Sequence, residues 1–147
     1  MCYEIRGCYM KSFELNVDVK TDSLAIIDDA VENSMREAGA SEASIISIDV
    51  AIDEIFSNVI FYSGLKEDDK ALIRVTLEDD DEKKITLEFI DEGKPFNPLE
   101  MPEPDVTKPA EERDIGGLGI FMVKKSMDHV SYRNEEGKNI LTIMKKI

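Results

Sequence analysis

The chain has 147 residues, of which 42% are hydrophobic and 34% charged. This length and balance predict one soluble globular domain, residues 1–147, and exclude a disordered chain. Acidic residues outnumber basic ones by 32 to 18, and the net charge of −14 argues against a nucleic-acid or anionic-lipid partner. No apolar run is long enough to span a membrane and no signal core is present at the N-terminus, so we expect a cytoplasmic protein.

The chain opens with a strand pattern followed by a helix pattern. Apolar and polar residues alternate over residues 13–19, which predicts a half-buried strand. Residues 24–38 then carry apolar side chains every three or four positions. This spacing predicts an amphipathic helix that begins within Thr21–Ser23 and ends at Gly39.

A second helix and two strands come next. The helix is expected to begin at Ser41 or Ser44 and to end near Tyr62, before Gly64. Alternating apolar residues predict strands over 73–77 and 85–89. The charged segment between these strands, residues 78–84, reads as a solvated hairpin loop.

A proline-rich segment interrupts the second half of the chain. All five prolines lie between Pro95 and Pro109, which excludes a continuous helix or a central strand there. Long loops inside compact domains often serve as lids, so we predict a lid at about residues 94–115. A third helix is expected from the glycine run at 116–119 to about Met127. Two final strands, near 130–133 and 140–144, are expected around a turn.

This order of elements predicts the fold class. Consecutive strands joined by tight turns favour an α+β two-layer sandwich, with a mostly antiparallel mixed sheet and helices on one face. A doubly wound sheet would require strand and helix to alternate throughout, and they do not.

The first candidate site lies on the second helix, in Asp53-Glu-Ile-Phe-Ser-Asn58. Glu54 and Asn58 are four residues apart, so they lie one above the other on one side of the helix. A carboxylate and a carboxamide in this arrangement could share a magnesium ion with its waters. Taken alone, the pair is more typical of an ordinary solvated helix face, because Glu-x-x-x-Asn often occurs by chance.

Two further segments carry glycines next to possible ligand contacts. Asp91 ends an apolar strand and could accept a hydrogen bond from an exocyclic amine, while Gly93 would let a flat ring approach the backbone. Gly116, Gly117 and Gly119 precede a helix and leave N–H groups free for an anion. Alone, the first segment reads as a strand and its turn, and the glycine cluster matches neither the P-loop nor the Rossmann pattern. In this order along one chain, however, the three segments supply the parts of an ATP site.

The ordered set resembles the Bergerat-type ATP-binding fold of the GHKL superfamily, and within it the anti-sigma-factor serine protein kinases. The N-box matches Asp53–Asn58, and the glycine boxes match Asp91-Glu-Gly-Lys-Pro-Phe-Asn-Pro98 and Gly116-Gly-Leu-Gly-Ile-Phe-Met-Val-Lys124. The closing strands also fit, so that the resemblance covers residues 10–147. Pro95-Phe96 stands where the wider superfamily often has a second glycine, and this favours the small kinases.

The resemblance implies a role for each site residue. Glu54 would be the general base, Asn58 the magnesium ligand and Asp91 the contact to the adenine amino group. Gly93 would line the base pocket. The residues expected to hold phosphates are Gly116, Gly117, Leu118 and Gly119, with Arg113 paired to the terminal phosphate. For Lys124 and Lys125 a solvated helix face and a phosphate contact both remain open.

The resemblance also implies a function and partners. We expect a kinase that uses ATP and Mg²⁺, phosphorylates a serine of a small antagonist protein and sequesters a sigma factor. It is expected to form a homodimer. Two alternatives stay open: a catalytically idle ATP-binding module that switches partner binding, and an interaction protein without a nucleotide.

Overall fold

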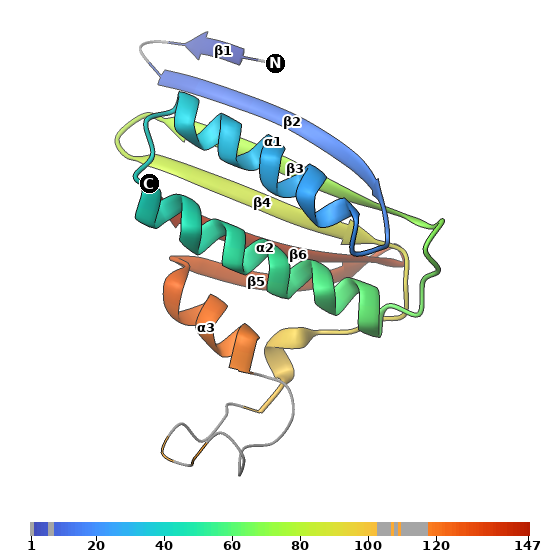
Figure 1. Cartoon of the computed structure of the whole chain (residues 1–147). Coiled ribbons are helices and arrows are strands. Elements are labelled where there is room, and N and C mark those ends of the chain that lie inside the picture. Colours follow the sequence, from blue (N-terminus) through green and yellow to red (C-terminus); the bar gives the residue numbers. More distant parts are fainter. Residues whose placement is uncertain (1, 6–7, 103–106, 108, 110–117) are drawn as a thin grey trace.

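The computed structural model describes residues 2–5, 8–102, 107, 109 and 118–147 (Figure 1). The chain forms helices and strands in the order β1 (Cys2–Ile5), β2 (Cys8–Asp18), α1 (Ser23–Glu37), α2 (Glu42–Tyr62), β3 (Lys70–Asp79), β4 (Lys83–Asp91), the 3-10 helix η1 (Pro98–Glu100), α3 (Leu118–Ser126), β5 (His129–Glu135) and β6 (Lys138–Lys146). The elements predicted from periodicity are all present. Two elements, β1 and η1, were not predicted.

The strands form one six-stranded sheet in the order β1-β2-β3-β4-β6-β5. Helices α1 and α2 lie side by side across one face of this sheet, and α3 lies next to α2 (Figure 1). The α+β two-layer fold is therefore confirmed. Every described pair of neighbouring strands is antiparallel, so the parallel pair that a mixed sheet would contain does not occur among them.

The core lies between the sheet and the two long helices. Alternate residues of β3 and β4 point towards the helices and are fully buried, among them Ile73, Val75 and Leu87. The apolar stripe of α2 covers them through side chains such as Ile52 and Phe56, which have no exposed surface. Each such side chain contributes roughly 1.5–3 kcal/mol of burial free energy, so this layer holds α2 and β4 in a fixed relation.

Local signals set the ends of the helices. Ser41, rather than Ser44, caps α2: its Oγ accepts a hydrogen bond from the Ser44 amide at 3.2 Å. Asp22 stands at the N-cap of α1 without a capping hydrogen bond from its side chain. Gly39 and Gly64 follow the two helices with φ of +80° and +73°, which is the left-handed conformation expected of a glycine after a helix.

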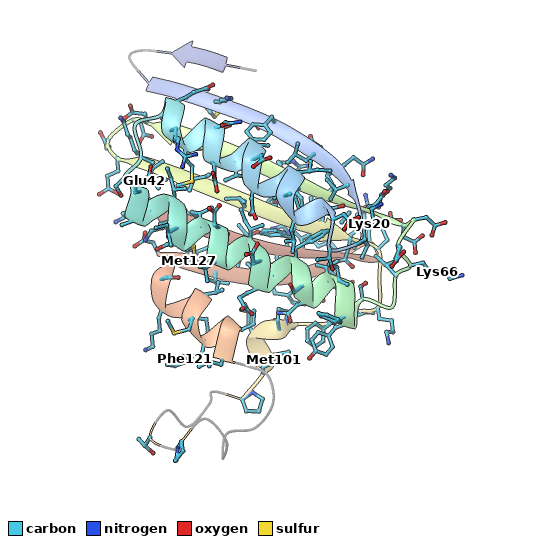
Figure 2. All side chains as sticks on the ribbon, in the orientation of Figure 1. Lys20, Glu42, Lys66, Met101, Phe121 and Met127 are labelled. Atoms are coloured by element: carbon cyan, nitrogen blue, oxygen red, sulfur yellow. The ribbon has the colours of Figure 1, made fainter. Side chains whose placement is uncertain are left out.

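The path after β4 brings distant segments together. The chain leaves the sheet at Asp91, passes through η1 and α3, enters the edge strand β5 and returns as β6 next to β4. This return places Asn139 opposite Asp91 in the strand register. Met101, just after η1, lies near the start of α3 (Figure 2), and Lys124 of α3 donates a 3.0 Å hydrogen bond to the Leu99 carbonyl of η1. The end of β4, the middle of α2 and the start of α3 thus meet on one side of the molecule.

Candidate functional site

Glu54 lies against the beginning of α3. A Cβ atom built at Gly119 would lie 1.8 Å from Glu54 Oε2 and 2.3 Å from its Cδ. The carboxylate of α2 therefore touches the first turn of α3, and glycine at 119 is what leaves room for it. The N-terminal end of a helix favours negative charge, so a carboxylate is a compatible neighbour there.

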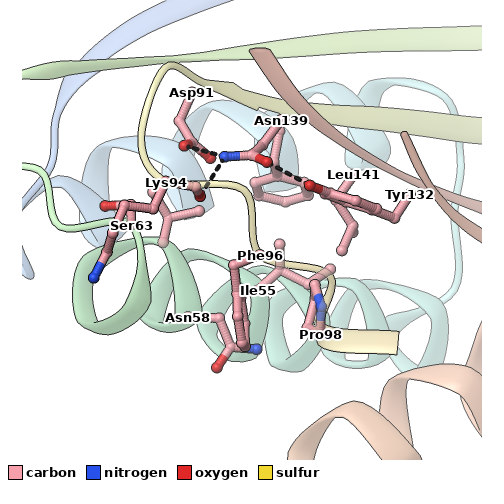
Figure 3. Close-up of a pocket in the computed structure, with 12 residues that line it drawn as sticks. Ile55, Asn58, Ser63, Asp91, Lys94, Phe96, Pro98, Tyr132, Asn139 and Leu141 are labelled. Carbon is pink, nitrogen blue, oxygen red and sulfur yellow. Dashed lines mark hydrogen bonds between the residues drawn. The ribbon is translucent and has the colours of Figure 1, made fainter. Parts of the chain in front are cut away.

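Asn58 lies one turn further along α2 and lines a pocket next to Phe96 (Figure 3). Its Nδ2 atom is buried and has no hydrogen-bond partner among the described residues. Such an unpartnered amide is costly unless a ligand or water satisfies it, typically by about 1–3 kcal/mol. The amide is thus a polar group available to a bound molecule.

Asp91 lies at the inner end of the same pocket, with only 6% of its surface exposed. Its Oδ1 atom accepts hydrogen bonds from the Gly93 amide at 2.9 Å and from Asn139 Nδ2 at 3.0 Å. A buried carboxylate is stable when it is hydrogen-bonded in this way. Both hydrogen bonds go to the same oxygen, so Oδ2 is the oxygen left for a ligand among the described groups.

Gly93 packs tightly against the end of α2. A Cβ atom at this position would lie 2.6 Å from both the Cβ and the carbonyl oxygen of Ser63. The Lys94 amide also donates a 2.8 Å hydrogen bond to that carbonyl. A glycine is therefore needed at position 93 because the backbone after β4 passes close to the backbone at Ser63, and not because of an unusual φ.

The pocket lies between α2, the turn after β4 and the two C-terminal strands (Figure 3). Apolar side chains form most of its wall, and the polar groups sit at its inner end and rim; the lining residues are Ile55, Asn58, Val59, Ser63, Phe89, Asp91, Lys94, Phe96, Pro98, Tyr132, Asn139 and Leu141. Apolar walls with a few placed polar groups are typical of small-molecule sites.

Phe96 lines the pocket and packs on Tyr62. Its ring stacks on Tyr62 with 4.6 Å between centroids and 20° between planes, and the space enclosed is about 30 Å³. That volume holds about one or two water molecules. A flat ring the size of a purine therefore requires Phe96 and its neighbours to move outward.

Asn139 is a candidate-site residue that the sequence did not reveal. Its side chain is 5% exposed and bonds to Asp91, to the carbonyls of Gly93 and Lys94, and to Tyr132 and Asn134. It stands just before the strand predicted near 140–144, in a segment of ordinary composition. Only the pairing of β6 with β4, which no local pattern encodes, could have pointed to it.

Some predicted site residues lie outside the described part of the chain: Arg113, Gly116 and Gly117, together with residues 103–106, 108 and 110–115 of the lid predicted at about 94–115. Leu118 is the first residue of α3 and is 42% exposed. Lys124 binds the Leu99 carbonyl, and the ammonium of Lys125 lies 5.4 Å from the centre of the Phe121 ring. Both lysines therefore make contacts within the protein, Lys124 with η1 and Lys125 with a ring of its own helix.

A second group of acids lies between α1 and α2, on the side of α2 that faces away from α3. Burial, and after it the nearby Asp53, raises the pKa of Asp28 to about 7. Burial and the hydrogen-bonded Glu32 raise the pKa of Asp49 to about 8. These side chains repel one another when ionised, so they are a pH-sensitive contact between the helices.

The described residues contain no group of three or more His, Cys, Asp or Glu side chains able to hold a metal ion. A metal at Asn58 would therefore take most of its ligands from a bound molecule. Magnesium often binds in this way, with few protein ligands and with phosphate oxygens. The Oδ1 oxygen of Asn58 fits that chemistry, whereas its Nδ2 group can only donate hydrogen bonds, for example to a phosphate or a water. In the described part of the chain, no helix is both long and apolar enough to span a bilayer.

Comparison with known proteins gives one family and a set of distant relatives. The model of the histidine kinase-like ATPase domain matches residues 17–145. Serine-protein kinase RsbW of Bacillus mycoides (strain KBAB4) is 22% identical over 135 residues, which cover 89% of this chain and 82% of that protein. The RsbW of Bacillus cereus (strain AH187) matches with the same values.

Two solved structures share the fold. The structure of the RsbU and RsbW domains of Rv1364c from Mycobacterium tuberculosis has a TM-score of 0.61 at 14% identity and covers 92% of this chain, which spans 32% of that one. The SiaB–SiaC complex from Pseudomonas aeruginosa gives a TM-score of 0.58 at 13% identity, covering 92% of this chain and 89% of the other. At these identities the likeness shows the architecture alone.

Proposed function

The chain belongs to the histidine kinase-like ATPase domain family, and on that premise we propose that it is an ATP-dependent serine protein kinase. In this proposal it phosphorylates a serine of a small antagonist protein and sequesters a sigma factor. One observation carries the proposal: Asn58 and Asp91 line a single pocket, and Glu54 touches the start of α3 one helical turn away. These two contacts support a nucleotide position that runs from the pocket to the start of α3.

Each residue has a task that follows from its place. The apolar wall would hold the adenine ring, and Asp91 Oδ2 would accept a hydrogen bond from its exocyclic amino group. Asn58 is the residue that would hold magnesium, which when bound neutralises charge on the phosphate oxygens. The N–H groups at the start of α3 would bind phosphates, together with Gly116, Gly117 and Arg113 as the resemblance implies.

Glu54 would act as the general base. Phosphoryl transfer depends mainly on positioning and charge stabilisation, and a carboxylate near the phosphates can accept the proton of the attacking serine hydroxyl. The contact with Gly119 supports this role, because it brings the carboxylate to the helix end where the phosphates would lie.

The partners are part of the proposal. The RsbW relatives are named serine-protein kinases, which supports a protein substrate, and the SiaB–SiaC neighbour is a complex of two proteins. The antagonist protein, the sigma factor and the homodimer follow from the family resemblance. Phe96 would move away from its position over the pocket when the nucleotide enters.

The test replaces Glu54 with Gln. We expect E54Q to bind Mg-ATP within about threefold of the wild type, while transfer of labelled phosphate to the cognate antagonist falls about 10²–10⁴-fold, the usual contribution of a positioned acid or base. Calorimetry measures binding, and labelled ATP measures transfer. The matched control is E42Q, in the exposed first turn of the same helix.

Three outcomes separate the alternatives. Unchanged transfer by E54Q would contradict the role of Glu54. A wild-type protein that binds Mg-ATP but transfers no label would be the idle regulatory module. No binding heat at high ATP concentration would remove the nucleotide from the function altogether.

A further inference from the structure

The side-chain amide of Asn139 uses its full hydrogen-bonding capacity within the protein. Its Nδ2 group donates to Asp91 Oδ1 at 3.0 Å and to the Lys94 carbonyl at 2.9 Å, with the Gly93 carbonyl at 3.3 Å. Its Oδ1 atom accepts from the Tyr132 hydroxyl and from Asn134 Nδ2. An amide has two donor hydrogens and two acceptor lone pairs, so none remains for a ligand.

This network determines the orientation of the Asp91 carboxylate in the pocket. The Asn139 donor (Figure 3) and the Gly93 amide both bind Oδ1, and these two hydrogen bonds fix the plane of the carboxylate. The remaining oxygen, Oδ2, can then only accept hydrogen bonds. An exocyclic amino group, as in adenine, satisfies it, whereas the 6-oxo group of guanine is repelled.

We propose that Asn139 is a positioning residue that sets the preference of the pocket for adenine over guanine, acting through Asp91. This inference rests on the proposed nucleotide function. Asn139 also binds the carbonyls of Gly93 and Lys94, so it holds the turn that leads to Phe96. The chain from Asn134 and Tyr132 to Asn139 and then to Asp91 links the β5–β6 hairpin to the base contact.

Without Asn139, the Asp91 carboxylate loses one of the two hydrogen bonds that hold it and can rotate. A carboxylate that is free to rotate can turn Oδ2 away from the 6-oxo group of guanine, which is then repelled less strongly. A site built to hydrogen-bond one group discriminates strongly only while its polar atoms are held in place. Loss of Asn139 should therefore reduce the discrimination between the two bases, and not only the affinity for both.

The experiment measures the dissociation constants of Mg-ATP and Mg-GTP by calorimetry for the wild type and for N139A. We expect the wild type to prefer ATP, and N139A to weaken ATP binding at least tenfold while GTP binding changes less than threefold. A collapse of the pocket would instead weaken both nucleotides equally, which would overturn the specific role of Asn139. Far-UV circular dichroism and thermal unfolding establish that each variant is folded.

N134A is a milder second variant. It removes one donor to Asn139 Oδ1 from a side chain on the exposed end of β5, so it should lower the ATP-to-GTP preference by a smaller factor in the same direction. T142V is the matched control, because Thr142 also lies on β6, its Oγ1 has no hydrogen-bond partner among the described residues, and it pairs with Glu88 rather than with Asp91. T142V should keep the wild-type preference.

The outcomes separate the role of Asn139 from the proposed nucleotide function. A wild type that binds neither nucleotide overturns both. A wild type that prefers ATP, with the same preference in folded N139A, overturns the role of Asn139 and leaves the nucleotide function standing. If N139A does not fold, an unchanged preference in N134A likewise overturns the role of Asn139.

Discussion

Gly119 allows a test of the proposed general base, Glu54, with a substitution that should leave the fold intact. A Cβ atom there would meet the carboxylate end of Glu54, at 1.8 Å from Oε2. That end belongs to a flexible side chain and moves aside, while alanine is favoured over glycine in a helix by roughly 1 kcal/mol. We expect G119A to be as stable as the wild type or slightly more stable in urea unfolding, while phosphoryl transfer falls about 10²-fold because the base is displaced.

Gly93 supplies the contrast to Gly119. A Cβ atom there would meet the Ser63 carbonyl oxygen at 2.6 Å, and this backbone atom is held by the Lys94 amide. G93A should therefore lose about 1–3 kcal/mol of stability as well as ATP binding. A G119A protein that transferred phosphate at the wild-type rate would contradict the placement of Glu54 in the reaction.

The sequence predicted the site residues that stand in local motifs and missed those that depend on tertiary contacts. Glu54 and Asn58 follow from helical spacing, and Asp91 from its place at a strand end. Asn139 comes to Asp91 from a strand that enters the sheet after a crossover, so no spacing within the chain reveals it. The position of Phe96 in the pocket wall likewise involves a tertiary contact, the stacking of its ring on Tyr62.

At the level of elements, the contact between α1 and α2 should depend on pH. Asp49 of α2 has its pKa raised from 3.8 to about 8 in the folded state by burial and by Glu32 of α1. The unfolded chain releases this proton near its ordinary pKa, so the folded state binds more protons between those values. Stability must therefore fall as pH rises from about 4 to about 8.

D49N should remove this penalty. At pH 8.5 we expect the variant to be more stable than the wild type by about 1 kcal/mol, a value reduced from the full pKa shift because these side chains are partly exposed and screened by solvent. At pH 5, where Asp49 is already protonated in the folded protein, the two should match. Urea unfolding at both pH values measures the difference, with D68N on the exposed loop before β3 as control. A difference of the same size at pH 5 would show that charge is not the cause.

Regular elements were predictable because their signals are local. The turn before β6 illustrates this: a turn was expected at 134–138, and Glu136 and Gly137 adopt φ of 53° and 78°, the pair of positive values typical of a tight hairpin. The order of the strands was not predictable. Strand β6 lies between β4 and β5 because it pairs with β4, and no local signal encodes pairing between two segments so distant in the sequence. The edge strand β1 has only four residues and no apolar alternation strong enough to mark it.

At the scale of the whole molecule, the net charge of −14 opposes folding through self-repulsion. Exposed ion pairs such as Lys11–Glu37 offset little of it, because such pairs contribute about 0–1 kcal/mol each. The same excess opposes the approach of a triphosphate. The proposed site would therefore rely on local positive groups: the start of α3, a bound metal and, as the resemblance implies, Arg113.

Salt should consequently stabilise this protein at neutral pH. The screening length falls from about 30 Å at 0.01 M salt to well under about 10 Å at 0.5 M, so repulsion between distant carboxylates weakens more than the short ion pairs do. We expect the melting temperature at pH 7.5 to rise by roughly 2–4 °C over that range of NaCl, equivalent to about 1 kcal/mol. The control is the same series near pH 4.4, the isoelectric point, where little net charge remains to be screened. A melting temperature that falls with salt at pH 7.5 would contradict this prediction. It would mean that the ion pairs stabilise the fold by more than the repulsion between carboxylates destabilises it.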